Sequence, residues 1–226
     1  MLFTEYKHNN LYLKNRVVRS ATADPEIYSE NKITPETLNR YQVLAENNIG
    51  LIITGDFPVT SIDMLPVSSE NWDQYSFESI QIKDVHKIPD VIHCTDSANK
   101  VIAQLTTDAI MRIPSDYNSP FGDLGMDVIT ESECKALALS FGAASLKYKD
   151  AGFDGVQIHA AHGGFLSLML SPLTNTRKDT YGNPTEIFKE IIMEIRKLCG
   201  DFPVIIKMNC TDYMPGGLGR SEFHKN

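Results

Sequence analysis

Two histidines, His159 and His162, are the residues whose type and spacing could do chemistry in this chain. They follow a short apolar run at 155–158 and precede a glycine pair. The carboxyl end of a parallel strand is where α/β proteins present side chains to small molecules. Two imidazole N–H groups aimed at one carbonyl or nitro oxygen would draw electron density from a conjugated double bond. We therefore predict that this pair binds and polarises a small acceptor.

Two other interpretations of an H-x-x-H pair stay open on these residues alone. One histidine could be structural and the other could lie on the surface, which is the commoner outcome for an arbitrary pair. The pair could also bind a metal in a metal-assisted barrel hydrolase. No third ligand lies close in the sequence, and the pair is not on one helix face, so we predict no metal site.

The elements that must position the histidines alternate between strands and helices. Strands are predicted at 16–22, 51–54, 101–105, 156–159 and 204–209, and helices at 34–48, 79–98, 130–150 and 185–198. This alternation requires a parallel sheet with right-handed crossovers, so the fold class is α/β. The pattern alone does not separate an open doubly wound sheet from part of a barrel.

Local signals mark two of these helix starts. Thr34 is followed by Pro35, a capping threonine with proline at the first helical position. Thr130 and Glu133 form a capping box. The helix at 79–98 is poorly marked because Pro89 lies inside it. The segments 56–77 and 106–128 are predicted to be long loops that shape a pocket.

Bulk composition limits the partners and the setting. The 226 residues carry a net charge of −8, which argues against a nucleic-acid or anionic-membrane partner. No apolar run approaches the roughly 20 residues of a membrane span, and the N-terminus has no signal pattern. The four cysteines form no C-x-x-C motif, so we expect neither zinc nor an iron–sulfur cluster, and a reducing, cytoplasmic setting. We expect one domain over residues 1–226.

Several segments, in order along the chain, resemble the old yellow enzyme family of FMN-dependent NAD(P)H:flavin oxidoreductases and ene-reductases. The wording HAAHG, then LSPLTN, then a D-x-Y-G turn is typical of that family. Other matching segments are LKNRVVRSAT, GLIITG, IAQL, AGFDGVQIHAAHG and FPVIIKMN. The resemblance covers nearly the whole chain. It implies a (β/α)8 TIM-barrel type of fold, of which about five βα units are present, with FMN as cofactor and NADH or NADPH as reductant.

The resemblance also implies roles for individual residues. The backbone of Ser20, Ala21 and Thr22 would line the flavin ring, and Gly55 would leave room for it. Gln104 would bind the pyrimidine edge, and Lys207 would stabilise negative charge on the reduced ring. His159 and His162 would bind the acceptor oxygen over the flavin. Two alternatives remain: Gln104 could satisfy a strand end, and Lys207 could pair with Asp212.

Four residues after the histidines are predicted to be structural. Asn175 should fix the loop that follows the short apolar helix. Arg177 and Asp179 should form an ion pair, and Tyr181 should pack rather than react.

Two departures from the family pattern limit the expected activity. The family tyrosine that donates the final proton would lie two residues after the second histidine, where this chain has Gly164. We therefore expect poor alkene reduction, with quinone, nitro or flavin-type acceptors less affected.

The second departure is that the sequence ends after about five strands. In such barrels the loops after strands seven and eight commonly hold a phosphate. Without them, FMN binding is expected to weaken by on the order of 10³-fold. Exposed sheet edges would also invite a second copy or a complementing chain. The alternative prediction is therefore an impaired remnant, or a half-barrel that needs a partner to bind FMN.

Overall fold

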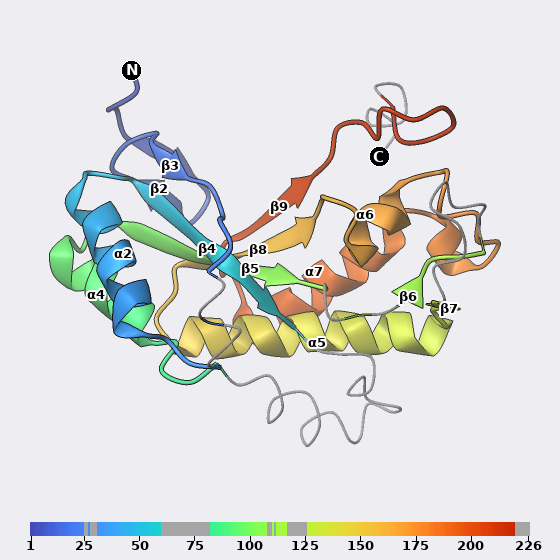
Figure 1. Cartoon of the computed structure of the whole chain (residues 1–226), viewed down its shortest axis with the longest axis horizontal. Coiled ribbons are helices and arrows are strands. Elements are labelled where there is room, and N and C mark those ends of the chain that lie inside the picture. The colour runs from blue at the N-terminus through green and yellow to red at the C-terminus, as the bar shows by residue number, and fades with distance from the viewer. Residues whose placement is uncertain are drawn as a thin grey trace.

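A curled, five-stranded parallel sheet forms the centre of the molecule. The computed structural model describes residues 1–24, 27, 31–59, 82–107, 110, 112–116 and 126–219. The sheet order is β3 (Val18–Arg19), β4 (Leu51–Pro58), β5 (Lys100–Thr106), β8 (Gly155–Ala160) and β9 (Val204–Met208). All neighbours pair in parallel, and chain order equals sheet order (Figure 1). The sheet is therefore half of a TIM-type barrel, which confirms the predicted α/β class.

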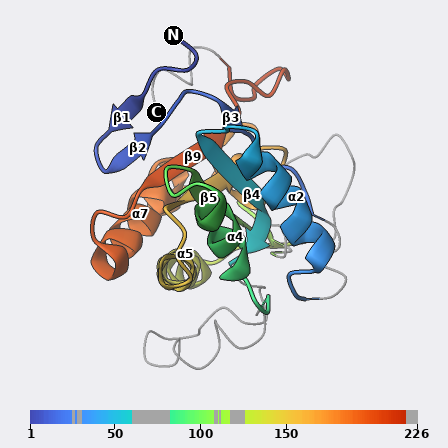
Figure 2. The ribbon, with the colours of Figure 1, turned by 90° about the vertical axis from the view of Figure 1, so that its left-hand side faces the viewer.

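Helices wrap the convex face of this half-barrel. They are α2 (Pro35–Glu46), α4 (Lys87–Thr95), α5 (Glu131–Asp150) and α7 (Glu186–Cys199), and Figure 2 shows them arranged around the sheet, with α5 seen end-on. Both predicted caps are confirmed. The Thr34 hydroxyl accepts the Thr37 N–H at 3.1 Å, and Thr130 and Glu133 form the reciprocal capping box.

Two predicted elements are shorter than expected. The predicted helix at 79–98 begins only at Lys87, so that Pro89 lies in its first turn. Proline is tolerated there because first-turn N–H groups have no intrahelical acceptor. The predicted strand at 16–22 is reduced to β3, whose two residues pair with Leu51 and Ile52 of β4. Residues 79–81 lie outside the described part of the chain.

The two predicted long loops are only partly loops. The first three residues of the segment 56–77 belong to β4, and residues 60–77 lie outside the described ranges. The segment 106–128 contains β6 (Arg112–Ile113) and β7 (Asp127–Val128), which pair in parallel. An unpredicted hairpin, β1 (Tyr6–His8) with β2 (Leu11–Leu13), precedes the sheet.

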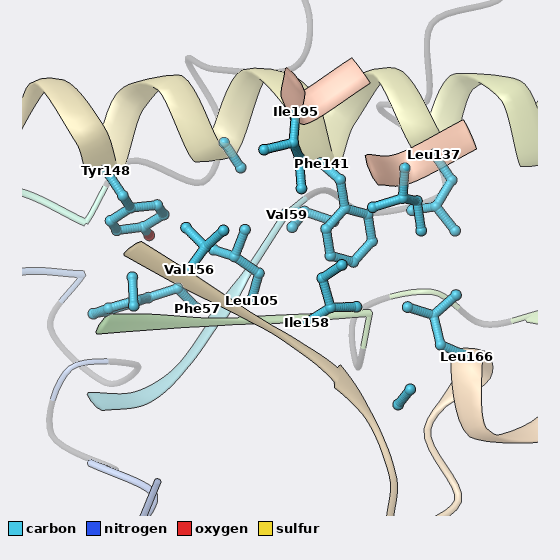
Figure 3. Close-up of a cluster of buried hydrophobic side chains, with 14 of the residues drawn as sticks. Phe57, Val59, Leu105, Leu137, Phe141, Tyr148, Val156, Ile158, Leu166 and Ile195 are labelled. Carbon is cyan, nitrogen blue, oxygen red and sulfur yellow. The ribbon is translucent and has the colours of Figure 1, made fainter. Parts of the chain in front are cut away.

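Alternate residues of the strands face two different environments. On the convex side, Phe57, Leu105, Val156 and Ile158 pack against α5 and α7 in the main apolar core (Figure 3). On the concave side, a smaller cluster of Leu13, Leu51, Ile53 and Ile102 fills the amino-terminal end of the half-barrel. The hairpin strand β2 supplies Leu13 to this cluster. The concave side is therefore apolar at one end, which leaves the other end for polar side chains.

A β-bulge in β4 changes which residues reach the concave side. Ile53 pairs with Ile102, but Asp56 pairs with Gln104, so β4 has one residue more than β5 between these pairs. The extra residue shifts the inside–outside alternation. Ile53 and Asp56 therefore both face inward, while Phe57 still reaches the main core.

No helix within the described ranges combines the length and apolar character that a membrane crossing requires.

Candidate active site

A pocket of about 750 Å³ opens at the carboxyl ends of β4, β5, β8 and β9. The strands contribute Asp56, Gln104, His159 and Lys207. The short strand β6 contributes Arg112, and the loops and the short helix α6 (Phe165–Leu170) contribute Ala21, Ala23, Thr107, Ile110, Met126, Ala161, His162, Gly163, Gly164, Phe165 and Leu168. Its size lies within the usual range for small-molecule sites.

The polar lining residues are cross-strand neighbours. Gln104 of β5 lies between Asp56 of β4 and Gln157 of β8. One layer further toward the carboxyl ends, His159 of β8 is the direct partner of Lys207 of β9. Strand register therefore brings together three of the residues that the family resemblance singled out, although they are far apart in the sequence.

The rings of His159 and His162 lie close together. Their ring centroids are 5.1 Å apart, with the planes at 64°. His159 is 8% exposed on its strand, while His162 is exposed in the turn that follows. This turn is tight because His162 and Gly163 both have positive φ, +59° and +79°. A non-glycine residue in that region is uncommon and is held there by its surroundings.

The side chain of Gln104 is fixed by its neighbour on β8. Its Nε2 donates to Gln157 Oε1 at 2.7 Å, and both side chains are buried. The backbone N–H of Gln104 also donates to Thr54 Oγ1, at 3.3 Å, beside the bulge in β4. Gln104 is therefore held on two sides while still lining the pocket.

Lys207 does not form the alternative ion pair with Asp212. Asp212 instead accepts hydrogen bonds of 2.6 Å from the Ser171 hydroxyl and from the Leu218 N–H. Lys207 lines the pocket, and no ion pair to it is found in the described part of the chain. Lys207 and His159 are cross-strand partners that line the same pocket.

The segment after β3 reaches the pocket through Ala21 and Ala23. Ser20 and Thr22 are exposed and do not line the cavity. A Cβ at Gly55 would lie 2.9 Å from the Thr22 carbonyl oxygen and from Asp24 Oδ2. Gly55 therefore allows this segment to approach β4 closely, and Gly55 itself is not part of the pocket lining.

A buried network holds this segment in place. The Tyr41 hydroxyl donates to Asp24 Oδ2 at 2.5 Å and accepts the Gly55 N–H at 3.2 Å. Burial and the neighbouring Asp24 carboxylate raise the pKa of Tyr41, so it stays a neutral donor. Arg40 lies 3.4 Å from the other oxygen of Asp24.

The loop after α6 is structural, as predicted. Arg177 and Asp179 form an ion pair, and the Arg177 guanidinium also donates to the Pro114 carbonyl at 2.8 Å. Asn175 Nδ2 donates to the carbonyls of Met169 and Tyr181, both at 2.9 Å. Tyr181 is buried. These bonds hold the loop in place, and Asn175, Arg177 and Tyr181 do not line the pocket.

Four polar residues of the site were not singled out individually from the sequence. Asp56, Thr107 and Arg112 lie in the two segments that were predicted to shape the pocket, and Asp56 faces inward because of the bulge. Arg112 also bonds to Glu133 Oε1 at 3.3 Å. Gln157 supports Gln104 from outside the lining. Its position two residues before His159, on the same strand face, is a signal that could have found it.

No group of three or more His, Cys, Asp or Glu side chains in the described ranges is arranged to hold a metal ion.

The fold and the pocket together define an α/β half-barrel with a cavity at the carboxyl edge of its sheet. The profile of the NADH:flavin oxidoreductase / NADH oxidase family matches residues 1–225, and the chain belongs to this family. This confirms the resemblance to old yellow enzymes. The family's cofactors are FMN and NADH or NADPH.

Similar proteins agree with this assignment. An NADPH dehydrogenase of Listeria monocytogenes serotype 4a (strain HCC23) is 30% identical over 96% of this chain, and the chain spans 66% of that relative's length. An NADPH dehydrogenase of Halalkalibacterium halodurans is 30% identical over 98% of this chain and 67% of its own. Old Yellow Enzyme from Pichia sp. AKU4542 has a similar fold, with a TM-score of 0.77, 24% identity, and coverage of 96% of this chain and 62% of its own.

Proposed function

We propose that residues 1–226 form a single partial-barrel domain of an FMN-dependent NAD(P)H oxidoreductase that acts on a small acceptor. The observation that carries this proposal is the convergence of His159 and His162, 5.1 Å apart at ring centroids, over a pocket that also contains Gln104 and Lys207. When bound, FMN supplies hydride transfer from NADH or NADPH to the acceptor. The chain's own residues would bind the cofactor and would orient and polarise the acceptor.

The donor set of the pocket fits a flavin ring. Gln104 offers an amide to the polar pyrimidine edge, and Lys207 offers a positive charge. Ala21, Ala161 and Leu168 offer apolar contacts of the kind that a fused ring needs. These residues would hold the cofactor through its ring.

The two histidines would bind the acceptor oxygen. Each imidazole can donate one N–H, and two donors on one oxygen favour electron flow toward it. Lys207 adds positive charge beside His159. Activated alkenes, quinones and related carbonyl or nitro compounds carry such an oxygen. Gly164 offers no proton, so acceptors that need no carbon protonation should be preferred.

A spectrum tests this proposal. Purified protein should take up added FMN, turn yellow and bleach anaerobically with NADPH or NADH, and an added quinone should restore the colour. His162→Ala should slow that restoration, whereas His8→Ala, on the exposed strand β1, should leave it unchanged. A protein that takes up no FMN would exclude the proposed activity for this chain.

A second candidate is an impaired remnant, or a half-barrel that needs a complementing segment in the same polypeptide or a separate chain. The edge strand β9 favours it, because Ile206 and Met208 on its convex side are each 38% exposed. Exposed apolar edges invite strand pairing. Native mass measurement distinguishes the two candidates. A monomer that binds FMN would exclude the second candidate, whereas a dimer, or FMN uptake only with an added partner, would support it.

A further inference from the structure

Gln157 contacts the pocket residue Gln104 without lining the pocket itself. We propose that Gln157 is a positioning residue that sets the orientation of the Gln104 amide, so that Gln104 presents its carbonyl oxygen to the ligand. The inference rests on the proposed function, because the ligand group concerned is the imide N–H of the flavin.

Strand register places the two side chains together. Gln104 and Gln157 are direct partners across β5 and β8, so their side chains lie on the same concave face. They are 4% and 7% exposed. Buried amides need hydrogen-bond partners, and here Gln104 Nε2 donates to Gln157 Oε1 at 2.7 Å.

The hydrogen bond selects one of two amide orientations. A glutamine amide has a donor end and an acceptor end, which a half-turn of its last torsion exchanges. Because Nε2 of Gln104 donates one of its two hydrogens to Gln157 Oε1, the orientation of the amide is fixed. Oε1 of Gln104 accepts no hydrogen bond from any residue in the described ranges and remains an acceptor.

The neighbour on the other side strengthens the preference for a donor. Asp56, the β4 partner of Gln104, lines the same pocket with a carboxylate. A ligand N–H in this part of the pocket would therefore face the oxygen of Gln104 and the carboxylate of Asp56, which attract it. A ligand carbonyl oxygen, which carries negative partial charge, would be repelled by the same two groups. The imide N–H of a flavin is such a donor.

The binding test compares two flavins and three variants. FMN carries a hydrogen on N3, and 3-methyl-FMN carries a methyl group there. Gln157→Met keeps the side-chain length but removes the acceptor, Gln157→Glu keeps an acceptor for Gln104 Nε2, and Gln42→Leu changes an exposed glutamine on α2 as the control. Dissociation constants come from quenching of flavin fluorescence.

The expected result is a selective loss. Gln157→Met should weaken FMN about fivefold, the effect of one ordinary hydrogen bond, and should reduce the preference for FMN over 3-methyl-FMN. Gln157→Glu and Gln42→Leu should keep that preference. Unchanged affinity and unchanged preference in Gln157→Met would overturn the positioning role.

A second readout works without any flavin. In the ligand-free protein, the side-chain amide signal of Gln104 in a ¹⁵N–¹H spectrum should exchange slowly with solvent, and Gln157→Met should make it exchange fast. If the protein binds no FMN, the proposed function fails. The amide measurement then still decides the role of Gln157, since fast exchange in the unmodified protein would contradict it.

Discussion

The two ends of the same parallel strands use polar side chains in opposite ways. At the amino ends, Asp154 accepts bonds from Lys100 Nζ at 2.8 Å and from the Val101 N–H at 2.9 Å, and its carboxylate lies 2.9 Å from His93 Nε2. At the carboxyl ends, His159, His162 and Lys207 surround a cavity instead. Polar groups that satisfy one another stabilise the fold, whereas groups directed at a cavity are available to a ligand.

The hydrogen bonds around Asp154 lower the pKa of its carboxyl. Burial opposes its ionisation, but the hydrogen bonds from His93, Lys100 and the Val101 N–H outweigh burial and lower its pKa. The carboxyl is therefore ionised near neutral pH, and its role is to tie α4, β5 and the start of β8 together.

The largest expected effect concerns the carboxyl end. His162→Ala removes an exposed donor, and kcat/KM for a carbonyl or quinone acceptor should fall about 10²- to 10³-fold, as for loss of one oxyanion donor. The free energy of unfolding in urea should change little. Equal activity in His162→Ala and the unmodified protein would contradict the role of His162 as a donor to the acceptor.

The next effect concerns the amino end. Asp154→Ala leaves His93, Lys100 and the Val101 N–H without the carboxylate that they contact. The free energy of unfolding should therefore fall by about 2 kcal/mol. FMN affinity and kcat should be retained below the unfolding transition. Asp201→Ala, at an exposed position, is the control. If Asp154→Ala folds as stably as the parent but loses FMN binding, Asp154 serves the ligand rather than the stability of the fold.

A gain of function should be available at the pocket. Gly164 has φ −63° and ψ 161°, which any residue can adopt, so Gly164→Tyr is compatible with the backbone. Enone turnover should rise about tenfold because a proton donor is restored, while quinone turnover stays level. The two acceptors assayed on one preparation form the control, and a failure of the enone rate to rise would refute this account of Gly164.

The smallest effect is a pH dependence of stability. The pKa of Asp154 is depressed in the folded protein, so its stabilisation is present above the ordinary aspartate pKa of 3.8 and is lost as the pH falls through the lower folded pKa. Unfolding free energies of the parent and Asp154→Asn should differ by about 1 kcal/mol at pH 7 and converge below about pH 4. A difference that instead grew in acid would contradict this sign.

Local signals allowed much of the fold to be predicted. The caps at Thr34 and Thr130 depend on residues within one helical turn, and both were confirmed. Pro89 made the helix predicted at 79–98 poorly marked, and the observed helix begins only at Lys87, with Pro89 in its first turn. The strands β5, β8 and β9 followed from apolar runs that only a sheet covered on one side or both can bury.

The parts that could not be predicted depend on distant segments. The length of β3 is set by its pairing with β4, and the entry of Asp56 into the pocket is set by a bulge opposite β5. The contact between Gln104 and Gln157 depends on register between β5 and β8. The histidine pair was recognised because its two members are close in the sequence.

The bulge in β4 has a consequence for how this strand can vary during evolution. Exchanging one residue type for another leaves the inside–outside alternation intact. Deleting one residue at Thr54 or Gly55 would leave a single residue between Ile53 and Asp56, which is the spacing of Ile102 and Gln104 on β5. The bulge would be lost, but Asp56 would still face the pocket, and Phe57, which stacks on Tyr148 at 5.0 Å, would still face the core. Descendants of this sequence should therefore tolerate loss of the extra residue in β4 better than an exchange of polarity at Asp56 or Phe57.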